Sequence, residues 1–159
     1  MRLMQAILAR EFGGPEVLKL EDLPDPAAGP GQVRVRVHAI GVNPYETYMR
    51  AGTYAIKPDL PYTPGADAAG VIDQVGPGVQ GWKNGDRVYI SGTAAGKAQG
   101  AYAQFAVCLP EQLHRLPDRI SFTQGAGLFV PEKKSKISDP RSSAREEGRR
   151  RVGDYELLQ

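Results

Sequence analysis

Hydrophobic and polar side chains alternate most clearly at residues 32–39, where three valines alternate with two arginines and a histidine. This alternation places the valines on one face of a strand and the polar side chains on the other, so the segment is predicted to be half-buried. Shorter apolar runs between turns that contain glycine or proline predict further strands. They lie at residues 3–8, 17–20, 69–75, 87–91 and 102–108.

A short helix is predicted directly after the alternating strand. Asn43 suits the N-cap, Pro44 the first helical position and Glu46 the third, and Gly52 suits the end of the helix. A second helix is predicted at residues 121–129, because a serine and a glutamine three positions apart form a capping-box pair. Short strands with few helices are typical of a small barrel or sandwich, so the predicted fold class is mainly β with short helices.

Composition and charge divide the chain near Pro131. The 19 glycines and 13 prolines favour many turns. Residues 1–131 carry 12 basic and 12 acidic side chains, whereas residues 132–159 carry 8 and 6 and hold the whole formal charge of +2. This second segment has few large apolar residues and cannot bury enough surface to offset its ordering entropy. We expect one domain at residues 1–131 and a basic, polar, disordered tail at 132–159.

The residue types exclude several classes of protein. One cysteine and two histidines exclude a disulfide framework and a structural zinc ribbon. His38 falls on the polar face of its strand, His114 lies beside a turn, and Cys108 is interpreted as a small buried side chain. The glycines at 76–78 and 92–100 lack the spacing of a phosphate-binding loop. Without a long apolar segment or a secretory signal, a soluble cytoplasmic protein is expected.

An ordered set of short motifs carries a resemblance to a known family. The motifs are FGGPEVL at 12–18, GVNP at 41–44, TYMRAGTY at 47–54, LPYTPGAD at 60–67, GDRV at 85–88, GAYA at 100–103, LP at 116–117 and the run 121–131. In order and spacing they resemble the zeta-crystallins, NADPH:quinone oxidoreductases of the medium-chain dehydrogenase/reductase superfamily. The resemblance covers residues 1–131 and implies a GroES-like, partly open β-barrel.

The same resemblance implies a reaction without zinc. In the zinc alcohol dehydrogenases of this superfamily, the position of Asn43 is a cysteine ligand and that of Ala66 a histidine ligand. An amide is a poor zinc ligand and a methyl group is none. The implied chemistry is the transfer of reducing equivalents from NADPH to a quinone or a similar activated carbonyl, with the protein positioning both partners.

The resemblance also places four residues beside the nicotinamide and substrate: Asn43, Tyr48, Tyr54 and Thr63. The amide and phenols would hydrogen-bond a carbonyl oxygen, and the rings would cover a flat quinone face. Other interpretations stay open, with Asn43 as an N-cap, Tyr48 as a core aromatic and Thr63 as a turn residue. Asp67 is expected to orient neighbouring groups, and no catalytic residue or metal ligand is assigned.

The match ends after Pro131, where the family continues into a Rossmann domain that binds the cofactor pyrophosphate. The remaining 28 residues are fewer than the roughly 30 of one βαβ unit. The Rossmann domain is therefore expected to be absent and the cofactor-binding residues unknown. Two hypotheses follow: a substrate-side domain with little activity alone, or a non-catalytic module that forms a homo-oligomer or binds full-length relatives or an acidic partner. Acids among the tail arginines argue against a nucleic-acid site.

Overall fold

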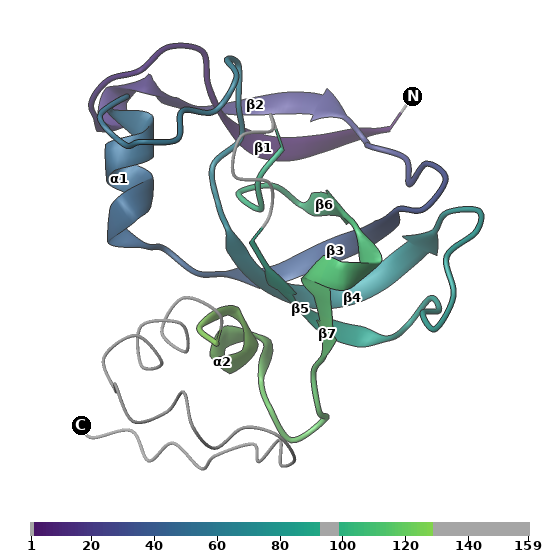
Figure 1. Cartoon of the computed structure of the whole chain (residues 1–159). Helices are drawn as coiled ribbons and strands as arrows, with labels where there is room; N and C mark the ends of the chain where they lie inside the picture. The colour runs from purple at the N-terminus through teal and green to yellow at the C-terminus, as the bar shows by residue number, and fades with distance from the viewer. Residues whose placement is uncertain (1, 93–98, 129–159) are drawn as a thin grey trace, which may run out of the picture.

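Two antiparallel sheets form the described part of the chain, residues 2–92 and 99–128 of a computed structural model (Figure 1). In the smaller sheet, β1 (Leu3–Ala9) pairs along its whole length with β2 (Leu18–Pro24). The larger sheet has the strand order β6-β3-β4-β5-β7. Its strands are β3 (Val33–Ile40), β4 (Asp67–Val75), β5 (Arg87–Ser91), β6 (Phe105–Cys108) and β7 (Leu113–Arg115). The mainly β fold with short helices is thus confirmed, and its sheets stay open rather than closing into a barrel.

The segment before β6 joins the two sheets. The backbone N–H of Ile7 in β1 donates to the Tyr102 carbonyl at 2.8 Å, and that of Gln104 donates to Gln5 at 3.0 Å. On its other side, the N–H of Val37 in β3 donates to the Gln104 carbonyl at 2.9 Å. The prediction of one strand at 102–108 was therefore wrong at its start. Residues 102–104 bridge the sheets, and the strand begins at Phe105.

The main core lies on one face of the larger sheet. Val33 and Val35 are fully buried there, as the alternating pattern predicted. Their buried neighbours are Ala68, Ile72, Val88, Ile90, Ala101, Ala106, Cys108 and Leu113. A second cluster on Ala69, Leu116 and Ala126 packs against the other side of β4. Both faces of β4 are covered, so this strand is the centre of the domain.

Two short helices flank the sheets. The first, α1 (Pro44–Arg50), has Asn43 at its N-cap, and Gly52 with a φ of 72° follows its last turn. The second, α2 (Phe122–Ala126), packs against the larger sheet and begins with the predicted capping box. There the Ser121 Oγ accepts the Gln124 N–H at 3.1 Å, and the Gln124 side chain accepts the Ser121 N–H at 3.0 Å. The structure ends α2 at Ala126, short of the predicted limit.

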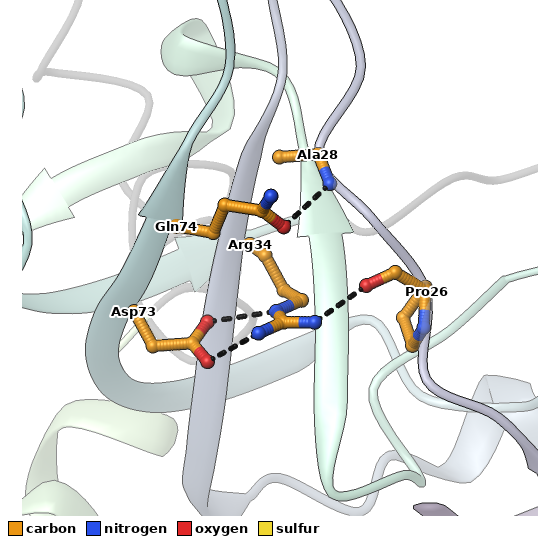
Figure 2. A network of polar contacts seen from close by, with 5 residues as sticks. All are labelled: Pro26, Ala28, Arg34, Asp73 and Gln74. Atoms are coloured by element: carbon orange, nitrogen blue, oxygen red, sulfur yellow. Dashed lines mark hydrogen bonds and ion pairs between the residues drawn. The ribbon is translucent and has the colours of Figure 1, made fainter. Parts of the chain in front are cut away.

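Arg34 ties the segment before β3 to the larger sheet (Figure 2). Its Nε and Nη2 atoms donate to both carboxylate oxygens of Asp73 in β4, at 2.9 and 2.7 Å. Its Nη1 donates to the carbonyl of Pro26 at 2.8 Å. The neighbouring Gln74 side chain accepts the Ala28 N–H at 2.9 Å. The guanidinium also lies 4.6 Å from the ring centroid of Phe105, so one side chain links two strands and a loop.

Several expectations fall on residues that the structure does not describe. They concern the boundary at Pro131, the tail at 132–159, Phe129 and most of the segment 92–100. Two short 3-10 turns complete the described part, at Pro15–Val17 and Pro110–Gln112. Neither described helix has the length and apolar character that crossing a membrane would require.

Candidate functional site

Asn43 lies between β3 and α1, with only 7% of its surface exposed. It occupies the N-cap position with extended backbone angles, as the sequence predicted. Its side chain, however, makes no capping hydrogen bond. The carboxamide Nδ2 instead donates to Oδ2 of Asp67 at 2.9 Å. Asp67, which was expected to orient neighbouring groups, thus contacts a predicted site residue.

A buried carboxylate, that of Glu46, lies next to this pair. Its Oε2 accepts the backbone N–H of Asn43 at 2.9 Å and the hydroxyl of Tyr102 at 3.0 Å. Its Oε1 accepts the backbone N–H of Ala66 at 2.8 Å. Burial raises the pKa of the Tyr102 hydroxyl well above its ordinary value, and the negative charge of Glu46 raises it further. Glu46 thus joins three segments that are far apart in the sequence.

Sequence reasoning treated Glu46 only as a helix-capping acid and gave Tyr102 no role in the site. The signal for Glu46 was present in its position, three residues after the N-cap, where a capping-box acid reaches back to the N-cap N–H. No comparable local signal indicates Tyr102, since its hydroxyl contacts a residue 56 positions earlier.

The tyrosines near α1 form an aromatic group, of which only part was predicted. The rings of Tyr45 and Tyr54 lie 5.7 Å apart between centroids. The backbone N–H of Tyr54 donates to the Tyr48 carbonyl at 3.2 Å, so the two predicted tyrosines belong to one turn. Tyr48 is 55% exposed, which contradicts its interpretation as a core aromatic. Tyr45 was not among the predicted site residues. Partial burial raises the pKa of its hydroxyl, and the charges of Glu46 and Asp67 add to this effect.

Thr63 is buried and lines a groove beside the smaller sheet. The groove has a volume of about 350 Å³ and includes Met4, Leu8, Leu23 and Phe105 among its lining residues. Neither Asn43 nor the two predicted tyrosines line it. The structure therefore places Asn43 before α1, Tyr48 within it and Tyr54 after it, while Thr63 lines a separate groove.

The remaining candidate side chains have structural roles. His38 is exposed and stacks on Phe122 of α2, with ring centroids 4.4 Å apart. The Nε2 of His114 lies 2.8 Å from Oγ of Ser91 on the neighbouring strand. Cys108 is 2% exposed, and burial raises the pKa of its thiol to about 12. Within the described ranges, no three His, Cys, Asp or Glu side chains are placed to hold a metal ion.

The Asn43 carboxamide is able to hydrogen-bond a polar ligand. One carboxamide N–H is taken by Asp67, and a carboxamide has a second N–H and an oxygen for other partners. Ala66 contributes a buried methyl group, and its N–H is used by Glu46. The rings of Tyr45 and Tyr54 form an aromatic pair, and Tyr45 is two residues from Asn43 in the sequence.

The part of the chain that contains Asn43, Ala66 and Asp67 matches a known protein family. The family described as the alcohol dehydrogenase GroES-like domain matches residues 29–118. The quinone oxidoreductase of Rattus norvegicus is 52% identical over 131 residues, covering 82% of this chain and 39% of the relative. That of Pseudomonas aeruginosa is 42% identical over 120 residues, covering 75% and 35%.

Solved structures resemble the chain over the same region. The crystal structure of Escherichia coli quinone oxidoreductase complexed with NADPH superposes with a TM-score of 0.73 at 36% sequence identity. The match covers 79% of this chain and 37% of that structure. The chain therefore spans about two fifths of the length of the relatives that it matches.

Proposed function

Because the chain belongs to the alcohol dehydrogenase GroES-like domain family, we propose that it is the substrate-side domain of a zinc-independent NADPH:quinone oxidoreductase. The observation that carries this proposal is the set of groups at Asn43, Ala66 and Asp67. A buried carboxamide held by a carboxylate, beside a methyl group, provides hydrogen bonds, and neither the amide nor the methyl group is a good zinc ligand. The similarity to quinone oxidoreductases supports the substrate class.

In this proposal the chain binds and orients the quinone. The second N–H of Asn43 donates to a quinone carbonyl, while the ring of Tyr54 covers the flat face of the substrate. The nicotinamide cofactor, when bound, supplies the hydride. Within the described residues, α1 begins at Asn43-Pro44 and α2 at Ser121-Phe122, so neither begins with the glycine-rich turn that binds a pyrophosphate.

The chain alone is therefore expected to have weak or no reductase activity. In this proposal its described residues form the surface that faces the nicotinamide and the quinone, and the rest of the dinucleotide is held elsewhere. Orientation of two reactants contributes about 7–11 kcal/mol to lowering a barrier. A domain that holds only one of them lacks most of that contribution.

Binding of duroquinone, a fully methylated quinone that resists addition of thiols, tests the proposal. Titration of the isotope-labelled chain should shift the backbone amide resonances of residues 41–54 and of Asp67. Tyr54→Ala should weaken binding about three- to tenfold through loss of aromatic contact. Leu20→Ala, which truncates an exposed side chain on β2, is the control and should bind as the wild type does.

Two results would contradict the proposal. Shifts confined to Met4, Phe105 and the rest of the Thr63 groove would move the quinone site away from Asn43. Saturable binding of NADPH by the chain alone, at micromolar concentration, would show that no other domain is needed to hold the cofactor.

A second candidate function is a non-catalytic interaction module. It is favoured by the exposed apolar side chains of Ile40, Val42, Tyr48 and Ile56, of which Val42 is 74% exposed. Such side chains, close together in the sequence around α1, are typical of a surface that another protein covers. Light scattering of the chain with and without a full-length relative distinguishes the two functions. A stable complex that binds no duroquinone would favour the module.

A further inference from the structure

α1 is held in place by a polar side chain rather than by an apolar one. Of its seven residues, Glu46 is the buried one, with 8% of its surface exposed. A helix this short is not stable by itself, so tertiary contacts must fix its position. Carboxylates are rarely buried unless they are well hydrogen-bonded. The three bonds that Glu46 accepts therefore anchor the start of α1, while Arg50 bonds Gly13 at its end.

These bonds fix both ends of the contact between Asn43 and Asp67. Glu46 accepts the backbone N–H of Asn43, the residue that donates in that contact. It also accepts the N–H of Ala66, which directly precedes Asp67, the residue that accepts. The donor and the acceptor are 24 positions apart in sequence. The Glu46 carboxylate and the backbone bond from Gly41 N–H to the Asp67 carbonyl, at 2.9 Å, together hold their backbones close.

We propose that Glu46 is a positioning residue that holds the Asn43 carboxamide in the orientation needed to bind the substrate carbonyl. This inference rests on the proposed function, in which Asn43 contacts the quinone. Asp67 sets which edge of the carboxamide faces the protein, because a carboxylate accepts only from the amide N–H₂ group. The pairing of β3 with β4 brings Asn43 near Asp67, and Glu46 fixes the backbone N–H of Asn43 so that the carboxamide points at Asp67.

Tyr102 provides the third hydrogen-bond donor to the Glu46 carboxylate. Its hydroxyl donates to Oε2, and its ring lies against Gly65. Its backbone is fixed by hydrogen bonds to Pro64 and Ile7. The phenol therefore shields the carboxylate and also reports on it, since the charge of Glu46 contributes to the raised pKa of Tyr102.

Glu46→Gln in the full chain tests the proposal. Glutamine has one acceptor oxygen, and its amide N–H₂ would face donors where Glu46 has its second oxygen. Either the Ala66 bond or the bonds from Asn43 and Tyr102 must then break. NMR should show exchange of the Asn43 carboxamide protons that is at least about tenfold faster, the change expected for one lost hydrogen bond to a charged group. The titration midpoint of Tyr102, followed by a ¹³Cζ label, should fall, and duroquinone should bind about tenfold more weakly.

Glu16→Gln is the matched control, since Glu16 also accepts a backbone N–H near the start of a short helix, from Gly14 at 2.9 Å. It should leave all three measurements unchanged. A folded Glu46→Gln variant whose Asn43 carboxamide exchanges as slowly as in the wild type would overturn the proposal. If that variant does not fold, Tyr102→Phe removes one of the three donors and should give a smaller acceleration of the same exchange. No acceleration in Tyr102→Phe would then overturn the proposal.

Failure of the proposed function gives a different result. If the wild type binds no duroquinone while Glu46→Gln still frees the Asn43 carboxamide, the quinone assignment fails and the positioning role stands. If the wild type binds duroquinone and the carboxamide is unaffected by Glu46→Gln, the quinone assignment stands and the positioning role fails.

Discussion

Gly65 lies where the chain approaches β4, with a backbone φ of 107° that side chains with a Cβ atom rarely adopt. A Cβ atom at this position would lie 2.5 Å from Cδ1 of Tyr102. Gly65→Ala is therefore expected to strain the backbone and displace the Tyr102 ring, lowering the free energy of unfolding by about 1–3 kcal/mol. Chemical denaturation followed by circular dichroism measures the loss.

Gly78→Ala separates backbone strain from steric contact. Gly78 has a similar positive φ of 82°, but a Cβ atom there would meet no neighbour within 4 Å. The Gly78 variant should lose less stability and leave the Tyr102 resonances unchanged. An equal loss of unfolding free energy in the two variants would show that contact with Tyr102 contributes nothing to the effect of Gly65→Ala.

For single residues, features of the site that depend on sequence neighbours were predictable, and features that depend on distant residues were not. The N-cap position of Asn43 follows from its immediate neighbours, so the sequence was sufficient to find it. The direction of its side chain depends on Asp67, which lies on another element. The alternative interpretation of Tyr48 as a core aromatic was wrong, because the buried residue of its helix is Glu46.

Among the elements, β3 and β4 are joined by their backbone pairing and also by the ion pair of Arg34 and Asp73. Both side chains are less than one fifth exposed, and the two bonds are parallel. Asp73→Asn removes the charge and one acceptor oxygen, so Arg34 keeps a poorly matched partner. We expect the free energy of unfolding to fall by about 1–3 kcal/mol, measured by urea denaturation.

Asp118→Asn provides the comparison for this ion pair. Asp118 also contacts an arginine, Arg87 at 3.5 Å, but its side chain is 98% exposed. Exposed pairs contribute little because water and salt screen them. A loss as large in Asp118→Asn as in Asp73→Asn would argue that burial of the Arg34 pair is unimportant.

Elements with a strong local pattern were predicted best. The alternation at β3 and the bounds of β5 agree with the structure to within a residue. β7 was missed, since three residues are too few to show a period and its place depends on pairing with β5. The way in which the two sheets are joined was not predicted, because it depends on bridging bonds between segments about 100 residues apart.

For the whole molecule, buried phenols predict how stability depends on pH. Burial is the main cause of a raised pKa at Tyr45, Tyr62 and Tyr102. In the unfolded chain these groups ionise near their ordinary pKa of about 10, while the folded state keeps their protons to higher pH. Their contribution to stability is therefore complete below about pH 10 and is lost as the pH rises above it. Urea midpoints across this range measure the decline.

Tyr102→Phe should make that decline shallower, because one buried ionisable group is removed. Leu20→Ala, which truncates an exposed side chain that does not ionise, is the control and should leave the slope as in the wild type. The thiol of Cys108 acts in the same direction, because burial raises its pKa also. Stability that rises above pH 10 would contradict the burial of these phenols.

The buried position of Cys108 also allows unfolding to be measured by labelling its thiol. The chain has a single cysteine, and its thiol lies within the main core of the larger sheet. A thiol reagent can reach it only when that core opens, so the labelling rate under native conditions follows the population of opened molecules. No dye or added tag is needed, and the variants discussed above can be ranked without denaturant. The same rate, measured with quinone or a partner protein present, would report any ligand that favours the closed core.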